Sequence, residues 1–211
     1  MSLARALPKN RTGDKSAYHH GDLSDALLVE AKRLVNKYGV ENISLRQVAV
    51  NVGVSPSAAY HHFPDKESLL KAAAKSAFED MADFQERALQ DLNGISALAV
   101  RRRFRALGQS YVGFAKKNPH LFRLAFGPYC AGEDMNREES RPWQMLLAVL
   151  QELDEIGDIH PAMRAYAEIL IWSTIHGTAN LILDGLLPVE TVDPVIQSLE
   201  LALKSAGKVA K

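Results

Sequence analysis

Residues 44–70 read SLRQVAVNVGVSPSAAYHHFPDKESLL, and this stretch decides the fold. Ser44 precedes an apolar-periodic run, and Gln47 follows three positions later, which is the capping-box pattern that begins a helix. Gly53 ends this helix after about two turns, because glycine is the usual residue past a helix C-terminus. The pattern predicts a short first helix followed by a tight turn.

A second short helix follows directly. Ser55 is suited to the N-cap, and Pro56 takes the first helical position, where a missing N–H costs nothing. The helix ends at Phe63 because the residue before a proline, here Pro64, disfavours the α region. Two short helices joined by a three-residue turn form a helix-turn-helix unit.

The two helices share an apolar seam, and the second helix turns polar groups outward. A helical hairpin buried in a bundle is the alternative, but outward serine, tyrosine and histidine side chains are unsuited to burial. The seam consists of Val48, Ala49, Val52, Val54, Ala59 and Phe63.

The outward side chains suit double-stranded DNA. Small residues at the start of the second helix, Ser57 and Ala58, let its N-terminal end approach base edges in a major groove. Arg46 is the long cation of the preceding helix and can reach a guanine or a phosphate. Tyr60 and His61 offer O–H and N–H donors for phosphate oxygens. We interpret this face as a DNA interface.

Two neighbouring features extend this interface. Lys66 begins the next helix, where backbone N–H groups and the helix dipole favour an anion. His61 and His62 project about 100° apart on a helix, so they point different ways and do not readily hold one metal ion. Which of the two histidines faces DNA stays open.

Residues 44–70 resemble the DNA-binding signature of the TetR family of bacterial regulators, and the match extends back to about residue 21. The shared features are a hydroxyl residue opening the first of these helices, a Gly-Val-Ser turn, a Tyr-x-His-Phe ending, and a lysine opening the long helix. Ala59 departs from the pattern, since many members carry a larger apolar residue there. The resemblance implies phosphate contacts from Ser44, Tyr60, His61 or His62, and Lys66, and base contacts from Arg46, Ser55, Ser57 and Ala58.

Composition and charge agree with a DNA-binding N-terminal part. The chain has 211 residues and no formal net charge, but residues 1–75 hold 11 Lys and Arg against 7 Asp and Glu. Residues 1–20 form a basic tail without helical periodicity. Cys130 is the only cysteine, which excludes an intrachain disulfide and suits a reducing cytosol. Without a signal peptide or a membrane-length apolar run, we expect a soluble cytoplasmic protein with no membrane partner.

The whole chain predicts an all-α fold of about nine helices. No stretch alternates as a half-buried strand does. We expect a helix-turn-helix DNA-binding domain over 21–66 and a ligand-binding and dimerisation domain over 67–211. The helices after the DNA-binding signature are expected at 66–92, 96–117, 119–126, 141–156, 161–186 and 191–206.

The C-terminal part contains Trp172-Ser173-Thr174-Ile175-His176-Gly177. It resembles the Trp-x-x-x-His-Gly (WHG) element of one C-terminal subgroup of TetR regulators. Trp172 and His176 lie four apart on one helix face, and Gly177 would let a neighbouring helix approach. His176 is either a hydrogen-bonded core histidine or the polar anchor of an apolar ligand pocket. The candidate pocket residues are Phe114, Phe122, Phe126, Trp143, Trp172 and His176.

The last two long helices, 161–186 and 191–206, are the expected interface of a homodimer. A two-fold dimer presents two recognition helices to the half-sites of a palindromic operator. The expected apolar interface residues are Ile169, Leu181, Ile182, Leu186, Leu199 and Leu203.

The sequence gives little evidence of a catalytic, cofactor or metal site. We see no nucleophile with its base, no phosphate loop and no zinc motif, so we expect neither catalytic residues nor a cofactor, and no metal. The arginine run 101–105 is expected to form a solvated face, paired in part with Asp80, Asp83 and Glu86, rather than a second nucleic-acid site.

The expected function is a ligand-responsive, homodimeric DNA-binding transcription regulator, a repressor that a largely apolar small-molecule effector releases from its operator. The alternatives are a constitutive DNA-binding protein without an effector and a helical binding module that does not bind DNA.

Overall fold

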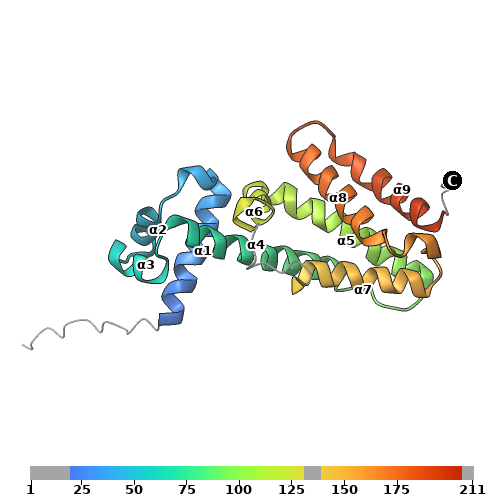
Figure 1. Ribbon diagram of the computed structural model, residues 1–211, viewed down its shortest axis with the longest axis horizontal. Helices are drawn as coiled ribbons and strands as arrows, with labels where there is room; N and C mark the ends of the chain where they lie inside the picture. The colour runs from blue at the N-terminus through green and yellow to red at the C-terminus, as the bar shows by residue number, and fades with distance from the viewer. Residues whose placement is uncertain (1–19, 131–138, 206–211) are drawn as a thin grey trace, which may run out of the picture.

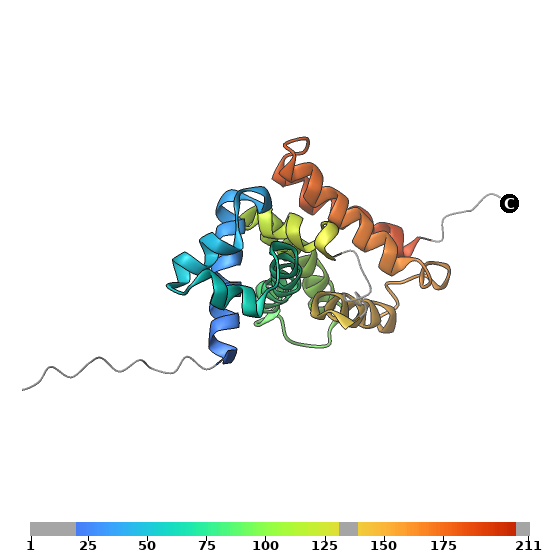
Figure 2. The ribbon, with the colours of Figure 1, turned by 60° about the vertical axis from the view of Figure 1, so that its left-hand side comes forward.

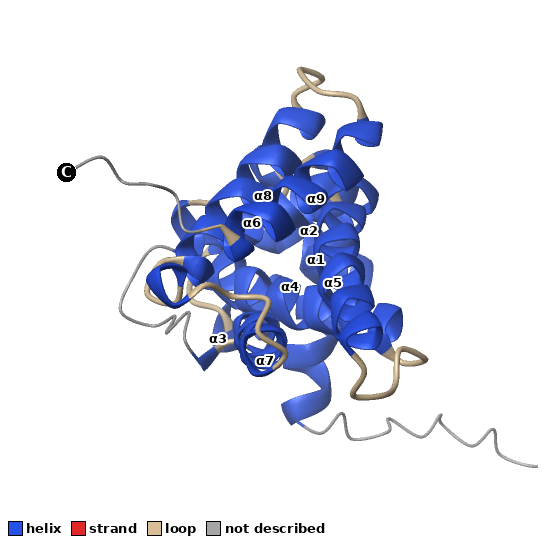
Figure 3. Cartoon of the chain, turned by 90° about the vertical axis from the view of Figure 1, so that its right-hand side faces the viewer, coloured by secondary structure: helices blue, strands red, loops and turns tan. Residues whose placement is uncertain are grey.

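The computed structural model describes residues 20–130 and 139–205, and every regular element within these ranges is a helix (Figure 3). The expected tail over residues 1–20 lies outside the described residues, apart from the first residue of α1. The α-helices are α1 (His20–Tyr38), α2 (Leu45–Val52), α3 (Pro56–His62), α4 (Lys66–Leu89), α5 (Ala97–Lys117), α6 (Pro119–Ala125), α7 (Arg141–Glu155), α8 (Ala167–Leu183) and α9 (Val192–Lys204). The all-α prediction is confirmed.

The helix-turn-helix forms through the expected local signals. The Ser44 hydroxyl accepts a hydrogen bond from the Gln47 backbone N–H, and the Ser55 hydroxyl accepts one from the Ala58 N–H. Gly53 closes α2 at φ 83°, a left-handed conformation that favours glycine. The capping box at Ser44 is only half formed, because among the described residues the Ser44 backbone N–H donates no hydrogen bond to the Gln47 side chain.

Four of the six predicted seam residues of α2 and α3 are buried, and Val52 and Val54 are half-buried against the core. Val48, Ala49 and Ala59 are fully inaccessible to solvent, and Phe63 is nearly so. The small side chain of Ala59 lies where the two helices meet, so it fits a close crossing. Leu27 of α1 completes this core from the other side. Tyr38 is exposed at the end of α1.

Helix α4 connects the two ends of the molecule. Figures 1 and 2 place α1–α3 to one side and α7–α9 to the other, with α4 running between them. Asp65 caps α4 in a complete capping box with Ser68, which fixes where the helix starts behind α3. The helix ends at Leu89, three residues before the expected end. Its long buried face makes it a shared wall of both ends.

Two polar contacts tie α1 to the rest of the chain. The Lys32 ammonium lies 2.8 Å from the Asp80 carboxylate on α4. The Asn36 side chain donates a hydrogen bond to Asn118, at the junction of α5 and α6. These contacts orient the three N-terminal helices relative to α4 and α6.

Helices α5, α8 and α9 pack closely at the far end. A Cβ atom added at Gly108 of α5 would lie 2.9 Å from Ile196 of α9, so glycine permits this approach. Leu199 and Leu203 of α9 are buried in the same subunit, 4% and 1% exposed, against our expectation that they lie at a dimer interface. Their burial follows from this packing of α9 on α5.

The expected helix 161–186 is shorter than predicted. Pro161–Met163 form a 3-10 turn, and α8 begins only at Ala167 and ends at Leu183. The His160 side chain accepts a hydrogen bond from the Ala162 N–H and holds that turn apart from the helix. A proline at a helix start is equally suited to a 3-10 turn, so the sequence pattern does not separate the two.

The arginine run is paired, but with partners other than those expected. Arg101 bonds to Asp158, Arg103 to Glu152, and Arg105 to Glu200. These ion pairs therefore hold α5 to α7, to α9 and to the loop before α8. The acids of α4 named in the expectation bind elsewhere: Arg141 lies 2.9 Å from Asp83 and 2.6 Å from Glu86, and Asp80 binds α1.

Candidate DNA interface and ligand cavity

The outer face of α3 presents the polar side chains that the sequence predicted. Ser55, Ser57 and His61 are exposed, and Tyr60 is 50% exposed although it is aromatic. Ala58 is half-buried beside them. This face therefore offers hydroxyl and imidazole groups to a ligand, with small residues at the N-terminal end of the helix.

Cationic and capping residues border this face. Arg46 is exposed on α2, and none of the ion pairs of the described residues involves it. Ser44 is exposed as well, with its hydroxyl engaged as the N-cap of α2. Lys66 is half-buried at the start of α4, with its ammonium 3.5 Å from the Glu41 carbonyl oxygen. Arg46 thus offers a charge that the fold itself does not use.

The two histidines at the end of α3 occupy different environments. His61 is exposed and His62 is half-buried, with ring centroids 6.0 Å apart and planes inclined by 55°. The exposures match the expected divergence of the two side chains. His61 is the one that points away from the protein surface.

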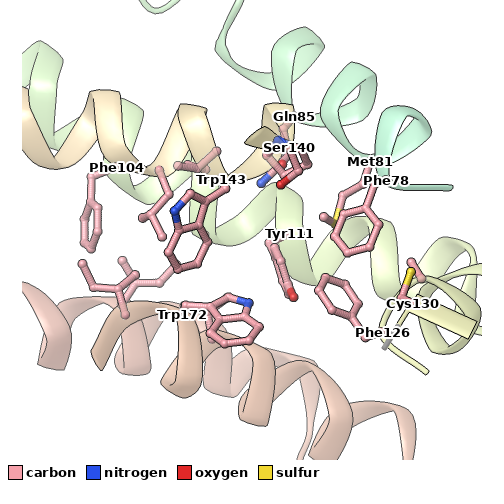
Figure 4. Close-up of a pocket in the computed structure, with 18 of the residues that line it drawn as sticks. Phe78, Met81, Gln85, Phe104, Tyr111, Phe126, Cys130, Ser140, Trp143 and Trp172 are labelled. Atoms are coloured by element: carbon pink, nitrogen blue, oxygen red, sulfur yellow. The ribbon is translucent and has the colours of Figure 1, made fainter. Parts of the chain in front are cut away.

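A cavity of about 250 Å³ lies between α4, α5, α7 and α8 (Figure 4). Its walls are mostly aromatic and aliphatic, and none of the described lining residues is charged. The lining residues are Phe78, Met81, Gln85, Phe104, Leu107, Gly108, Tyr111, Ala125, Phe126, Gly127, Cys130, Ser140, Pro142, Trp143, Leu146, Ile171, Trp172, Ile175 and Ile196.

Three of the six candidate pocket residues line this cavity: Phe126, Trp143 and Trp172. The two tryptophans meet edge to face with ring centroids 5.7 Å apart. They come from α7 and α8, so a ligand packed against this pair would contact both helices.

The other three candidates lie outside the cavity lining. Phe122 is fully buried behind it, in contact with Phe126 at 4.9 Å between ring centroids. Phe114 packs against Phe84 on the far side of α5. His176 lies behind the Phe126 ring, 4.7 Å from it, and does not form part of the wall.

His176 is held by Tyr111. The Tyr111 hydroxyl lies 2.8 Å from His176 Nδ1, which corresponds to the core-histidine alternative. Burial raises the pKa of Tyr111 well above its usual range, while a hydrogen bond with the Trp172 side chain acts in the opposite direction. Burial also lowers the pKa of His176, so the neutral imidazole is favoured. This pair is a polar unit built into an aromatic layer.

Sequence reasoning missed several lining residues. Tyr111 and Met81 lie on the buried stripes of α5 and α4, where an apolar periodicity marks core but not which core residues border a cavity. Gln85 gave a usable signal, because it is a polar residue on the otherwise apolar buried face of α4. The buried face of α4 therefore contains more of the residues that line the cavity than the WHG element does.

Cys130 lines the cavity as a half-buried thiol. Burial raises its pKa to about 11, so the reactive thiolate is disfavoured at neutral pH. Among the described residues, no group of histidine, cysteine, aspartate or glutamate side chains could hold a metal ion. Within residues 20–130 and 139–205, no helix combines the length and apolarity of a membrane span.

Comparison with known families assigns both parts of the chain. Residues 27–73 match the family described as bacterial regulatory proteins, tetR family, and residues 104–206 match the tetracyclin repressor-like C-terminal domain. Together the two matches cover more than half of the chain. The chain belongs to the TetR family of transcriptional regulators. Its helix-turn-helix is thus a DNA-binding unit of that family.

Individual relatives are distant. The nucleoid occlusion factor SlmA of Photobacterium profundum is 26% identical over 144 residues, which is 68% of this chain and 69% of that protein. The HTH-type transcriptional regulator Rv1816 of Mycobacterium tuberculosis is 31% identical over 49% of this chain and 43% of that protein. The chain thus spans less than half of the length of this second relative.

Solved structures share the whole architecture. A protein with unknown function from Rhodococcus sp. RHA1 has 31% identity and a TM-score of 0.75, covering 90% of this chain and all of that one. A TetR family transcription regulator from Marinobacter aquaeolei has 23% identity and a TM-score of 0.62, covering 85% of this chain and 94% of that one. At that identity, the second likeness shows the fold alone.

Proposed function

We propose that this TetR-family regulator is a homodimeric repressor that a small, largely apolar effector releases from a palindromic operator. The observation that carries the proposal is the apolar cavity of about 250 Å³, which lies against the C-terminal half of α4. The N-terminal end of α4 lies against the helix-turn-helix. A ligand there can contact the same helix that positions α3. It then shifts the protein away from its DNA-competent state by no more than its differential affinity for the two states.

The proposed DNA contacts are those named from the sequence. Exposure supports Arg46, Ser55, Ser57 and His61 as groups that can reach DNA, and favours His61 over His62 as the phosphate contact. We assign residues 21–66 to the DNA-binding domain, with the remaining contacts from Ser44, Ala58, Tyr60 and Lys66.

The proposed dimer forms through α8 and α9. On α8, Ile169, Ser173, Gly177 and Leu181 lie four residues apart and share one outward face. Ile169 and Leu181 are 48% and 41% exposed, although they are large and apolar. A Cβ atom at Gly177 would meet nothing within 4 Å in the subunit, so its small size is unused there.

This unused space fits a neighbouring helix from a second copy. A helix that is apolar on nearly all sides is normally covered on all sides. Helix α8 packs on α5, α7 and α9, but Ile169, Ser173 and Leu181 stay exposed in the subunit. Small residues flanked by large apolar ones allow two α8 helices to approach closely. Leu201, 71% exposed on α9, is a further large apolar residue at the surface.

The C-terminal part, residues 67–211, is proposed to belong to the WHG subgroup and to bind the effector. Trp172 supports this as a cavity wall, and His176 supports it as the half-buried partner of Tyr111. We also propose a cytoplasmic location, where the operator DNA of a bacterial regulator lies.

The test combines two measurements on the full chain. Thermal shifts across a panel of small apolar metabolites identify binders, and mobility shifts with the selected operator measure DNA release by each binder. The proposal expects at least one compound that raises the melting temperature and releases DNA. A panel without binders, together with tight DNA affinity, would favour the constitutive DNA-binding protein.

A further inference from the structure

A buried amide without a partner lies in the cavity wall. Gln85 of α4 is only 2% exposed, and its buried side-chain oxygen has no hydrogen-bond partner among the described residues. An amide removed from water without such a partner costs free energy, so native proteins seldom leave one unpaired. The Gln85 side-chain oxygen is therefore a candidate to accept a hydrogen bond from a bound molecule.

The surroundings of Gln85 identify the missing partner as a ligand group. Gln85 lines the cavity, and Figure 4 shows it beside Ser140 on the side away from Trp172. The Tyr111 hydroxyl, which belongs to another lining residue, is already engaged with His176. Ser140 is the polar neighbour in this part of the wall, whereas Met81, one helical turn earlier on α4, is apolar.

Once a ligand fills the cavity, water no longer satisfies the Gln85 side-chain oxygen. In the free protein, a cavity of about 250 Å³ has room for water that bonds to the Gln85 oxygen. A ligand that displaces this water must replace its hydrogen bond or lose affinity. Only a molecule with an O–H or N–H group in the right place satisfies that condition.

We infer that the effector is a neutral, largely apolar molecule with one hydrogen-bond donor, a hydroxyl or N–H group, that donates to the Gln85 side-chain oxygen. This inference rests on the proposed sensing function and adds the chemistry of the ligand. A charged ligand is disfavoured because the described lining residues hold no opposite charge to pair with it.

The cavity also limits the size of the ligand. Its volume of about 250 Å³ exceeds the ~150 Å³ that accommodates benzene and lies just below the usual range for drug-sized ligands. A compound with one or two rings, or a comparably short chain, fits.

The test uses three probes of similar shape that differ in one group. 4-Propylphenol donates and accepts a hydrogen bond, 4-propylanisole only accepts, and propylbenzene does neither. Trp143 and Trp172 are the only tryptophans of the chain, and both line the cavity. Intrinsic fluorescence of the full chain therefore reports binding directly.

The variant Gln85→Met removes the amide and keeps the length of the side chain, and Met81→Leu changes the neighbouring wall without altering polarity. The wild-type protein and Met81→Leu should bind the phenol about tenfold or more tightly than the anisole or the hydrocarbon. In Gln85→Met, the three affinities should lie within about threefold of each other. Because it removes an unpaired buried polar group, Gln85→Met should also fold with an unchanged or raised melting temperature.

Each other outcome is decisive. Equal affinities for the three probes in the wild-type protein, or a preference for the phenol that persists in Gln85→Met, would overturn the role of Gln85 and leave the sensing function standing. If none of the probes changes the fluorescence of the wild-type protein, both this inference and the use of the cavity as a ligand site are wrong.

Discussion

The Tyr111 hydroxyl and His176 Nδ1 lie 2.8 Å apart and join α5 to α8 behind the cavity wall. The Phe122 and Phe126 rings surround the pair, with centroids 5.4 Å and 4.7 Å from the imidazole. A polar bond inside an aromatic layer fixes the relative position of two helices more specifically than apolar packing alone. It therefore helps to hold the wall to which Trp172 belongs.

The burial of His176 gives stability a defined dependence on pH. Its pKa is lowered from the ordinary 6.5 by burial, so the unfolded chain takes up the proton at higher pH than the folded chain. The contribution of neutral His176 to the free energy of unfolding is complete above about pH 6.5 and is lost as the pH falls toward its folded pKa.

Chemical denaturation at about pH 7.5 and about pH 5.5 checks this dependence. The His176→Gln variant does not titrate and should lose less stability over this interval than the wild-type protein. The carboxylates with lowered pKa values, such as Asp158, act only at lower pH and do not contribute here. Identical losses in the two proteins would contradict the assignment.

Arg46→Ala should weaken operator binding and relax sequence preference. If Arg46 contacts a base, the loss is about 1–3 kcal/mol for the operator and smaller for random DNA. Arg102→Ala is the matched control, since Arg102 is exposed on α5 and the change removes the same charge far from α3. Mobility-shift titrations with both DNAs measure the effect; equal losses in the two variants would leave Arg46 without a specific role.

Gly177→Leu should break the dimer and spare the subunit. A Cβ atom at this position has no atom of the described residues within 4 Å, but the leucine would lie between two α8 helices at the proposed interface. We expect a dimer weakened by about 1–3 kcal/mol, the usual cost of overpacking, with weaker operator binding as a result. Sedimentation velocity reports the oligomeric state, and Gln151→Leu on the exposed face of α7 is the control. A Gly177→Leu dimer as tight as that of the control would place the interface elsewhere.

Leu146→Trp should fill the cavity and block the effector response. Leu146 lines the cavity and is nearly buried, so the larger ring extends into the open volume. Effector affinity should fall about tenfold or more, or 1.4 kcal/mol, while DNA affinity stays nearly constant. Leu98→Trp adds the same ring at an exposed position of α5 and should leave both affinities unchanged. A Leu146→Trp protein that still releases DNA at the wild-type effector concentration would show that the cavity is not the sensing site.

Local signals in the sequence predicted most of the fold, because capping and turn residues act over a few positions. Ser44, Gly53 and Ser55 each form the predicted helix boundary. The error at Pro161 has the same local origin, since a proline after His160 starts a 3-10 turn as readily as a helix.

The cavity was predicted less well, because it depends on how helices from distant parts of the chain meet. Trp143 and Trp172 were identifiable as aromatic residues on apolar faces. Nothing local distinguishes Phe114, on the far side of α5, from a lining residue. The partners of Arg101 and Arg103 were wrong for the same reason, since charge pairing between helices follows from tertiary packing.

The most direct test of the central claim is selection of binding sites from random DNA by the full chain. A dimer that presents two α3 helices predicts an enriched palindrome whose half-sites are centred about 10 base pairs, or a small multiple of that, apart. Affinity for the selected site should fall steeply with salt, because phosphate contacts release counterions. A single asymmetric site, or no enriched sequence at all, would contradict the account.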